Sequence, residues 1–198
     1  MKVILINNFV VLPLFLLSVI YIDGWTVNLS FAIEDIPTPT RLAATFLFCM
    51  LLDDFQFYFV HRFQHWKYIY PYIHKHHHEY KMPVAMAAEA SHPLDFLLAG
   101  VISGGLSIML LGKNMHVGTL AAWSVVRTFE GCDGHSGYEF PWSPIRLLPF
   151  SSSAQTHDFH HSHNVGNYSS FFYIWDTIMG TNTAYLSHLD ELRKKKSS

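Results

Sequence analysis

Residues 42–65 read LAATFLFCMLLDDFQFYFVHRFQH, and this segment indicates the class of fold. Its first eleven residues are apolar, which is typical of a helix that crosses a membrane. Asp53 and Asp54 follow, and carboxylates are costly in lipid unless they face a functional interior. The stretch ends in His61 and His65, which lie about one helical turn apart. It therefore predicts a membrane helix that delivers two imidazoles to one of its ends.

Three further apolar runs accompany this helix. About 20 helical residues cross the roughly 30 Å hydrocarbon layer, so the short fourth run is expected to be tilted or paired in a re-entrant hairpin. A cleaved signal peptide is the alternative for the first run, although a poor match to a cleavage site follows it. The predicted class is an all-α membrane bundle with about four transmembrane or re-entrant helices. The expected spans are residues 3–22, 42–60, 93–111 and 117–129.

The composition limits the class of protein further. The chain of 198 residues has a mass of 22.8 kDa, which is about the size of one domain. Its net charge is −2. Nucleic-acid binding is excluded, because 13 Lys and Arg are outnumbered by 15 Asp and Glu and form no basic stripe. Cys49 and Cys132 do not form a disulfide framework. Half of the residues are hydrophobic, yet polar, histidine-rich stretches alternate with them, which indicates a membrane protein with an aqueous part.

The distribution of Lys and Arg predicts the orientation. Basic residues gather at Lys2, in residues 62–81 and in residues 193–196, whereas residues 23–39 carry acidic ones. The positive-inside rule then places the three basic segments on the cytoplasmic side and residues 23–39 on the opposite side. One single domain, residues 1–198, would therefore have a cytosolic, histidine-rich catalytic cap at one membrane face. The expected parts are residues 61–92 and 132–185 for the cap and residues 186–198 for a tail.

The fourteen histidines fall mainly into three clusters. The first cluster reads H-x-x-x-H and the other two read H-x-x-H-H, spacings that place imidazoles on one helix face. A zinc or iron ion typically takes three or four protein nitrogens, so eight imidazoles predict a pair of metal ions. The predicted ligands and catalytic residues are His61, His65, His74, His77, His78, His157, His160 and His161.

Six histidines lie outside these positions. His92 opens the third span and His135 follows the fourth, so both are expected at the face where the clusters lie. Each is expected either as a further ligand or, alternatively, as a helix cap or a packed ring. The remaining four are expected to bind no metal: His76, His116, His163 and His188.

Carboxylates near the clusters are expected to support the imidazoles. A ligand imidazole is neutral, and its free ring N–H needs an acceptor that fixes the tautomer. Asp54, Glu79 and Asp158 are predicted to accept these protons. Nitrogen ligands alone suit iron, copper, nickel and zinc. A membrane-buried site without an obvious hydrolytic nucleophile favours oxygen chemistry on iron, with a zinc hydrolase as an alternative.

Longer motifs surround the clusters. They are residues 73–80 (IHKHHHEY), 88–94 (AEASHPL), 135–141 (HSGYEFP), 157–168 (HDFHHSHNVGNY) and 175–181 (WDTIMGT). With these motifs the chain resembles the fatty acid hydroxylase and sterol desaturase superfamily, in particular its C4-methylsterol monooxygenase branch. The resemblance covers nearly all of residues 40–185.

The resemblance implies a two-iron oxygenase of the endoplasmic reticulum membrane. Such an enzyme oxidises the C4-methyl group of a sterol precursor with O2 and takes electrons from NAD(P)H through cytochrome b5 and its reductase. The eight clustered histidines would be the iron ligands, with His135 and then His92 as further ones. Another sterol or fatty acid hydroxylase or desaturase is an alternative. Members of this branch usually carry a further apolar segment before the first one here, so a catalytically incompetent accessory membrane protein is a second alternative.

Overall fold

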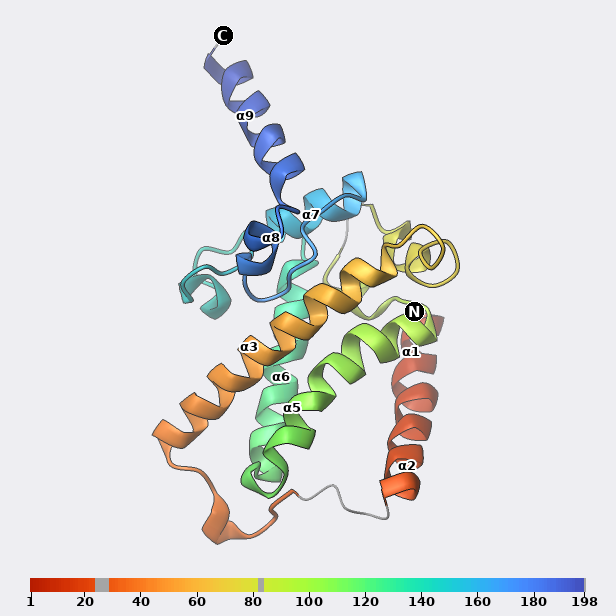
Figure 1. Ribbon diagram of the computed structural model, residues 1–198, viewed down its shortest axis with the longest axis vertical. Helices are drawn as coiled ribbons and strands as arrows, with labels where there is room; N and C mark the ends of the chain where they lie inside the picture. The colour runs from red at the N-terminus through yellow and green to blue at the C-terminus, as the bar shows by residue number, and fades with distance from the viewer. Residues whose placement is uncertain (24–28, 82–83, 198) are drawn as a thin grey trace.

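The structure is a computed structural model that describes residues 1–23, 29–81 and 84–197. Within these ranges the secondary structure is helical, apart from two isolated β-bridges. Four apolar helical segments run along the molecule, and the short segments that carry most histidines gather at one end of them (Figure 1). The predicted all-helical class is confirmed for the described residues. The count of four crossings stays a prediction.

The first apolar segment is continuous through α1 (Lys2–Ile6), the π-helical η1 (Asn7–Val11) and α2 (Leu12–Asp23). The wider turn of η1 precedes Pro13, whose ring cannot donate to the preceding turn and displaces its carbonyl. The Asn7 side chain is buried and donates to the carbonyl of Ser91 at 3.0 Å. This bond fixes the start of the chain at the histidine-bearing end.

The second apolar segment is α3 (Pro39–Gln64). It begins with Thr38, whose side chain accepts from the backbone N–H of Arg41, and with a proline at the first helical position. Together with the helical stretch Pro93–Asn114, α3 is long and apolar enough to cross a membrane. Only 22% of the apolar window of each is buried, so these helices are not core helices of a water-soluble fold. Their exposed apolar faces indicate a membrane protein.

The third and fourth segments form a helical hairpin, and its re-entrant placement in the membrane stays a prediction. The third consists of α4 (Pro93–Asp95), the π-helical η5 (Phe96–Ile102) and α5 (Ser103–Leu111), which packs against α3. After η6 (Gly112–Asn114), the fourth is α6 (Val117–Gly134), five residues longer than the predicted 117–129. The packed interior between α3, α6 and the C-terminal region contains Cys49, Met115, Trp123, Phe171 and Phe172.

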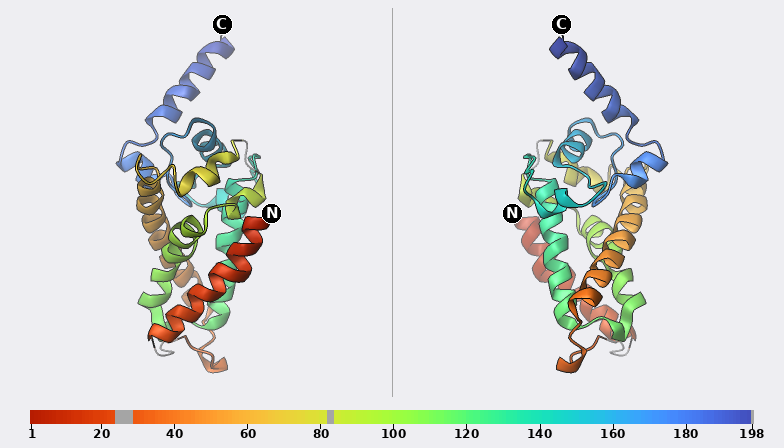
Figure 2. Two further views of the ribbon diagram at one scale, coloured as in Figure 1. Left: turned by 90° about the vertical axis from the view of Figure 1, so that its right-hand side faces the viewer. Right: turned by 90° about the vertical axis from the view of Figure 1, so that its left-hand side faces the viewer.

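Short helices close the histidine-bearing end. They are η3 (His74–Glu79), η4 (Ala85–Glu89), η7 (Pro144–Leu147), α7 (Ala154–His163) and α8 (Ile174–Ile178). The short η2 (Ile33–Asp35) lies at the opposite end of the molecule (Figure 1). The last helix, α9 (Thr183–Ser197), projects away from the rest of the molecule in all views (Figures 1 and 2). The expected tail of residues 186–198 is thus mostly helical, because α9 begins before it and continues through Ser197.

Candidate metal centre

Four segments supply the imidazoles at this end of the molecule. The first cluster lies at the end of α3, with His61 in the last turn and His65 as the C-cap residue. The second cluster lies on η3 and the third on α7, while His135 directly follows α6. A capping box between Ser153 and Thr156 starts α7 immediately before its histidines. The first two segments follow each other closely in the sequence, but α6 and α7 come much later, so only the tertiary fold brings all four together.

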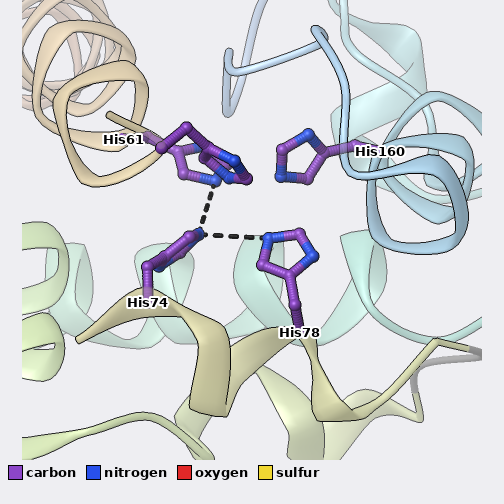
Figure 3. Close-up of side chains that lie close together, drawn as sticks. His61, His74, His78 and His160 are labelled. Carbon is purple, nitrogen blue, oxygen red and sulfur yellow. Dashed lines mark hydrogen bonds between the residues drawn. The ribbon is translucent and has the colours of Figure 1, made fainter. Parts of the chain in front are cut away.

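Nine imidazoles form two compact groups. Within each group the nearest ring nitrogens all lie within 4.8 Å of one another. The first group contains His61, His65, His74, His78 and His160, and the second group contains His77, His135, His157 and His161. In the first group, His61, His74, His78 and His160 turn their rings toward a common centre (Figure 3).

The two H-x-x-H-H clusters divide between the groups in a crossed pattern. The outer pair of η3, His74 and His78, belongs to the first group, while His77 belongs to the second. In α7 the outer pair, His157 and His161, belongs to the second group, while His160 belongs to the first group. The expected single ligand face of these two clusters is therefore wrong. The rings of η3 and α7 contact each other in both groups, His78 against His160 in the first and His77 against His161 in the second, so each helix supplies imidazoles to both centres.

Hydrogen bonds fix the tautomers in the first group. The Nδ1 atom of His61 lies 2.9 Å from the carbonyl oxygen of Tyr168, and that of His160 contacts the carbonyl of Gly166. The Nδ1 atom of His74 lies 2.9 Å from a carboxylate oxygen of Asp95. These oxygens can only accept, so each neutral ring carries its proton on Nδ1 and a lone pair on Nε2.

In the second group, too, Nδ1 atoms face oxygens that can only accept a hydrogen bond. The Nδ1 atom of His135 lies 2.7 Å from the carbonyl oxygen of Gly131, and that of His161 lies 3.1 Å from the carbonyl oxygen of Tyr80. Burial lowers the pKa of His135 to about 4 and that of His161 to about 3. Both rings are therefore neutral at neutral pH, which is the form that binds metal.

The converging lone pairs fit a metal ion. The Nε2 atoms of His61 and His74 lie 3.1 Å apart, yet both carry lone pairs, so they cannot hydrogen-bond to each other. In the second group the Nε2 atoms of His135 and His77 lie 3.1 Å apart, and those of His157 and His135 lie 2.9 Å apart. Ligand nitrogens at about 2.0–2.1 Å from one ion are separated by about 3 Å when they are neighbours. Both groups thus have the donor set and spacing of a metal site.

The predicted histidines do not all join the groups. The eight clustered ones and His135 do, whereas His92 lies outside both. Its Nδ1 accepts from the backbone N–H of Leu94 and so caps α4, which was the alternative for this residue. His116 caps α6 in the same way through Gly118.

The predicted carboxylate partners are corrected by the structure. Asp54 accepts from the backbone N–H groups of Ser170 and Phe172, because it faces the loop that follows α7 instead of the imidazoles. Glu79 lies 3.2 Å from the outward-facing His76. Asp158 lines a surface hollow beside α9, because it is rotated about 100° from His157 on α7.

Asp95 is the buried carboxylate that the sequence analysis missed. It contacts His74 and also accepts from the side chain of Gln64 at 2.8 Å. Its exposed fraction is 3%. A carboxylate at the start of an apolar span, three residues after His92, was the signal that could have identified it.

An apolar cavity of about 450 Å³ leads to both groups. Glycines on η5 and α5 leave room for it, since a Cβ atom on Gly105 would meet open space. Leu12, Leu16, Ile108 and Leu120 line its apolar part. The imidazoles that reach its wall are His61, His74, His77, His135 and His157.

Comparison with known proteins assigns this architecture to a family. The family model described as fatty acid hydroxylase matches residues 46–181, a range that contains all three histidine clusters. The chain belongs to the fatty acid hydroxylase family. The histidine groups together with this membership indicate iron binding.

Individual relatives carry more specific names. The chain is 37% identical over 196 residues to methylsterol monooxygenase 1 of Gallus gallus, an alignment of 98% of this chain and 64% of the relative. It is 42% identical over 183 residues to a methylsterol monooxygenase of Aspergillus fumigatus (91% and 60%) and 40% identical over 147 residues to the C-4 methylsterol oxidase of Candida albicans (73% and 48%). The chain thus spans less than two thirds of the length of these relatives. No solved structure matches it.

Proposed function

We propose that the chain is a membrane-bound di-iron monooxygenase that oxidises the C4-methyl group of sterol precursors with O2 in sterol biosynthesis. The names of the relatives support the substrate and the reaction. Two groups of converging imidazoles support two metal ions. The single observation that carries the proposal is that one apolar cavity reaches both groups.

In this proposal the nine grouped histidines hold the irons and supply the catalytic centre. The bound irons would supply the oxidation of an unactivated C–H bond with O2. The backbone carbonyls of Tyr168, Gly166, Gly131 and Tyr80 keep the imidazoles oriented through their Nδ1 atoms. The apolar cavity would hold the sterol skeleton, place its methyl group at the histidines and exclude water.

We further propose that both groups face the cytosol at the endoplasmic reticulum membrane. Electrons would then come from NAD(P)H through cytochrome b5 and its reductase. The hydrogen bond of Asn7 to Ser91 supports this orientation, because it puts the basic N-terminus at the histidine-bearing end. The Lys-rich end of α9 also projects from that end (Figure 2).

Turnover by membranes that contain the chain tests the proposed function. With NADPH and a 4,4-dimethyl sterol we expect a product oxidised at a C4-methyl group. The His160→Asn variant should lose this activity, whereas His116→Asn should keep it, because His116 caps α6 outside both groups. An iron-loaded wild-type chain that leaves the methylsterol unchanged but oxidises another lipid would overturn the assigned substrate.

A further inference from the structure

A polar patch interrupts the otherwise apolar wall of the cavity. It includes Arg127 and Glu130 of α6 and the serines 169 and 170. The Nη1 atom of Arg127 donates to Glu130 at 2.6 Å, and its Nε lies 2.9 Å from Asp53 of α3. Charged groups so deep between apolar helices are costly and are retained mainly where they serve a function.

Glu130 keeps unused acceptor capacity toward the cavity. One of its oxygens accepts from Arg127 and the other from the hydroxyl of Ser170 at 3.0 Å. A carboxylate has about four lone-pair positions, so each oxygen can accept another bond. The residue is 8% exposed, and it lines the cavity wall. A hydrogen-bond donor in the cavity could therefore reach a charged acceptor.

Ser169 provides an independent sign of a ligand. Its hydroxyl is buried, lines the same cavity and has no hydrogen-bond partner among the described residues. A buried hydroxyl without a partner costs free energy. A ligand group that both donates and accepts would satisfy Ser169 and Glu130 together.

The hydrogen-bonding groups of the patch select the kind of ligand. Glu130 can only accept, whereas the Ser169 hydroxyl can donate or accept. An ionised carboxylate has no proton to give to Glu130, whereas a neutral alcohol offers both the donor and the acceptor that the patch needs.

We infer that Glu130 and Ser169 recognise the hydroxyl group of a lipid alcohol. In a methylsterol the only hydroxyl lies on the carbon beside C4, so this contact would place the C4-methyl groups next to the histidines. This identity of the alcohol rests on the proposed function. The recognition itself separates alcohols from free fatty acids as occupants of the cavity.

Equilibrium binding tests the inference without requiring turnover. The metal-loaded full chain in detergent micelles, under anaerobic conditions, would be titrated with a C4-methylsterol and with its 3-deoxy counterpart, each displacing a fluorescent sterol. We expect the alcohol to bind at least about tenfold more tightly, because a hydrogen bond to a charged group contributes that much. Glu130→Gln and Ser169→Ala should reduce this ratio toward one and leave the affinity for the deoxy compound unchanged.

Two matched variants control for the loss of charge and hydroxyl. Glu139→Gln removes another arginine-paired carboxylate outside the cavity, and Ser124→Ala removes a cavity hydroxyl that already donates to the carbonyl of Leu120. Both should keep the wild-type ratio. Equal losses for alcohol and deoxy compound in Glu130→Gln would show a merely structural role and overturn the inference. A wild-type ratio near one, or a free fatty acid bound as tightly as the alcohol, would also overturn it.

The same titration separates this inference from the proposed function. If the wild type prefers the alcohol in binding but does not oxidise a methylsterol, the recognition site stands and the assigned reaction fails. If it oxidises the methylsterol but binds alcohol and deoxy compound equally, the reaction stands and the recognition by Glu130 fails.

Discussion

The position of one proton on each imidazole determines what the two groups can bind. Carbonyl oxygens and one carboxylate hold this proton on Nδ1 in His61, His74, His135 and His161. The Nε2 lone pairs are then left to face one another. This arrangement is unfavourable without a cation, so the surrounding acceptors are as important for metal binding as the ligands themselves.

Replacing Asp95 tests this role of the acceptors. Asp95→Asn removes the charge that faces Nδ1 of His74 and keeps the shape of the side chain. We expect the affinity of the first group for iron to fall by about 10–100-fold, as is typical when such a partner is lost. Competition with a chelator, followed by metal analysis, measures it.

Asp158→Asn is the matched control. Asp158 was predicted from the sequence to support an imidazole, but it lines the hollow beside α9. Its variant should keep the wild-type affinity for iron. If Asp158→Asn lost iron and Asp95→Asn did not, the assignment from the structure would be wrong and the one from the sequence right.

Gly166 is required by its close contact with Thr181. It has φ +61°, and a Cβ atom there would lie 2.0 Å from the carbonyl oxygen of Thr181. Since the carbonyl of Gly166 holds His160, we expect Gly166→Ala to lower thermal stability and to displace this ligand, with loss of iron. Gly180 also has a positive φ but open space around it, so Gly180→Ala should cost only about 1 kcal/mol. Equal thermal shifts in the two variants would contradict this account.

At the scale of helices, the bounds of the apolar helices were predictable from the sequence, whereas the contacts of individual side chains were not. The third expected span coincides with α4 through α5, and the second lies within α3. The sequence also identified eight clustered histidines, because spacing on a helix is a local property. It could not divide them into two groups, since that depends on how η3 packs against α7. The contact of Asp95 with His74 is equally a product of the tertiary fold.

The glycines of α5 make a prediction about the cavity. Gly105→Leu would place a side chain into the open space beside this residue. We expect sterol binding to weaken at least tenfold, because the added side chain and the substrate compete for the same volume. Iron content should stay at the wild-type level, which metal analysis checks.

Gly105→Ala serves as the size control. A single methyl group leaves most of the cavity open, and alanine is favoured over glycine inside a helix. The affinity for sterol should change little. Unchanged sterol binding in Gly105→Leu would mean that the substrate does not occupy this cavity.

The whole molecule combines an apolar bundle with one polar end. Large side chains such as Leu47, Leu51, Met109 and Val125 are exposed on the bundle, as lipid-facing residues are expected to be. The grouped imidazoles lie at one end, and α9 leaves from that same end (Figure 1). Under the proposed function, protein partners that deliver electrons would approach this polar end, where the grouped imidazoles lie.

Protease accessibility tests this orientation. An epitope tag placed after the last residue should be removed by protease added outside sealed microsomes, because the C-terminus is expected in the cytosol. A lumenal marker protein in the same vesicles should stay intact and shows that they are sealed. A protected tag that is lost only after detergent is added would reverse the proposed orientation.

Acid should destabilise the metal-free protein. The pKa of His135 falls from 6.5 to about 4 on folding and that of His161 from 6.5 to about 3. Between these values the unfolded chain binds protons that the folded chain cannot, so stability is present above pH 6.5 and decreases as the pH falls. Each such histidine contributes a slope of up to about 1.4 kcal/mol per pH unit. Melting temperatures in detergent after chelation, measured from pH 7 to pH 4, check this, and a flat profile would contradict it.

The iron content of the purified chain tests the central claim most directly. The two groups predict about two irons per wild-type chain, and about one iron after substitution of His135 and His157 together, which belong only to the second group. The protein should be produced with ample iron and analysed for iron and zinc by mass spectrometry. Two irons in the wild type and one in the double variant are the predicted result. At most one metal ion in the wild type, or the same metal content in both proteins, would contradict the account.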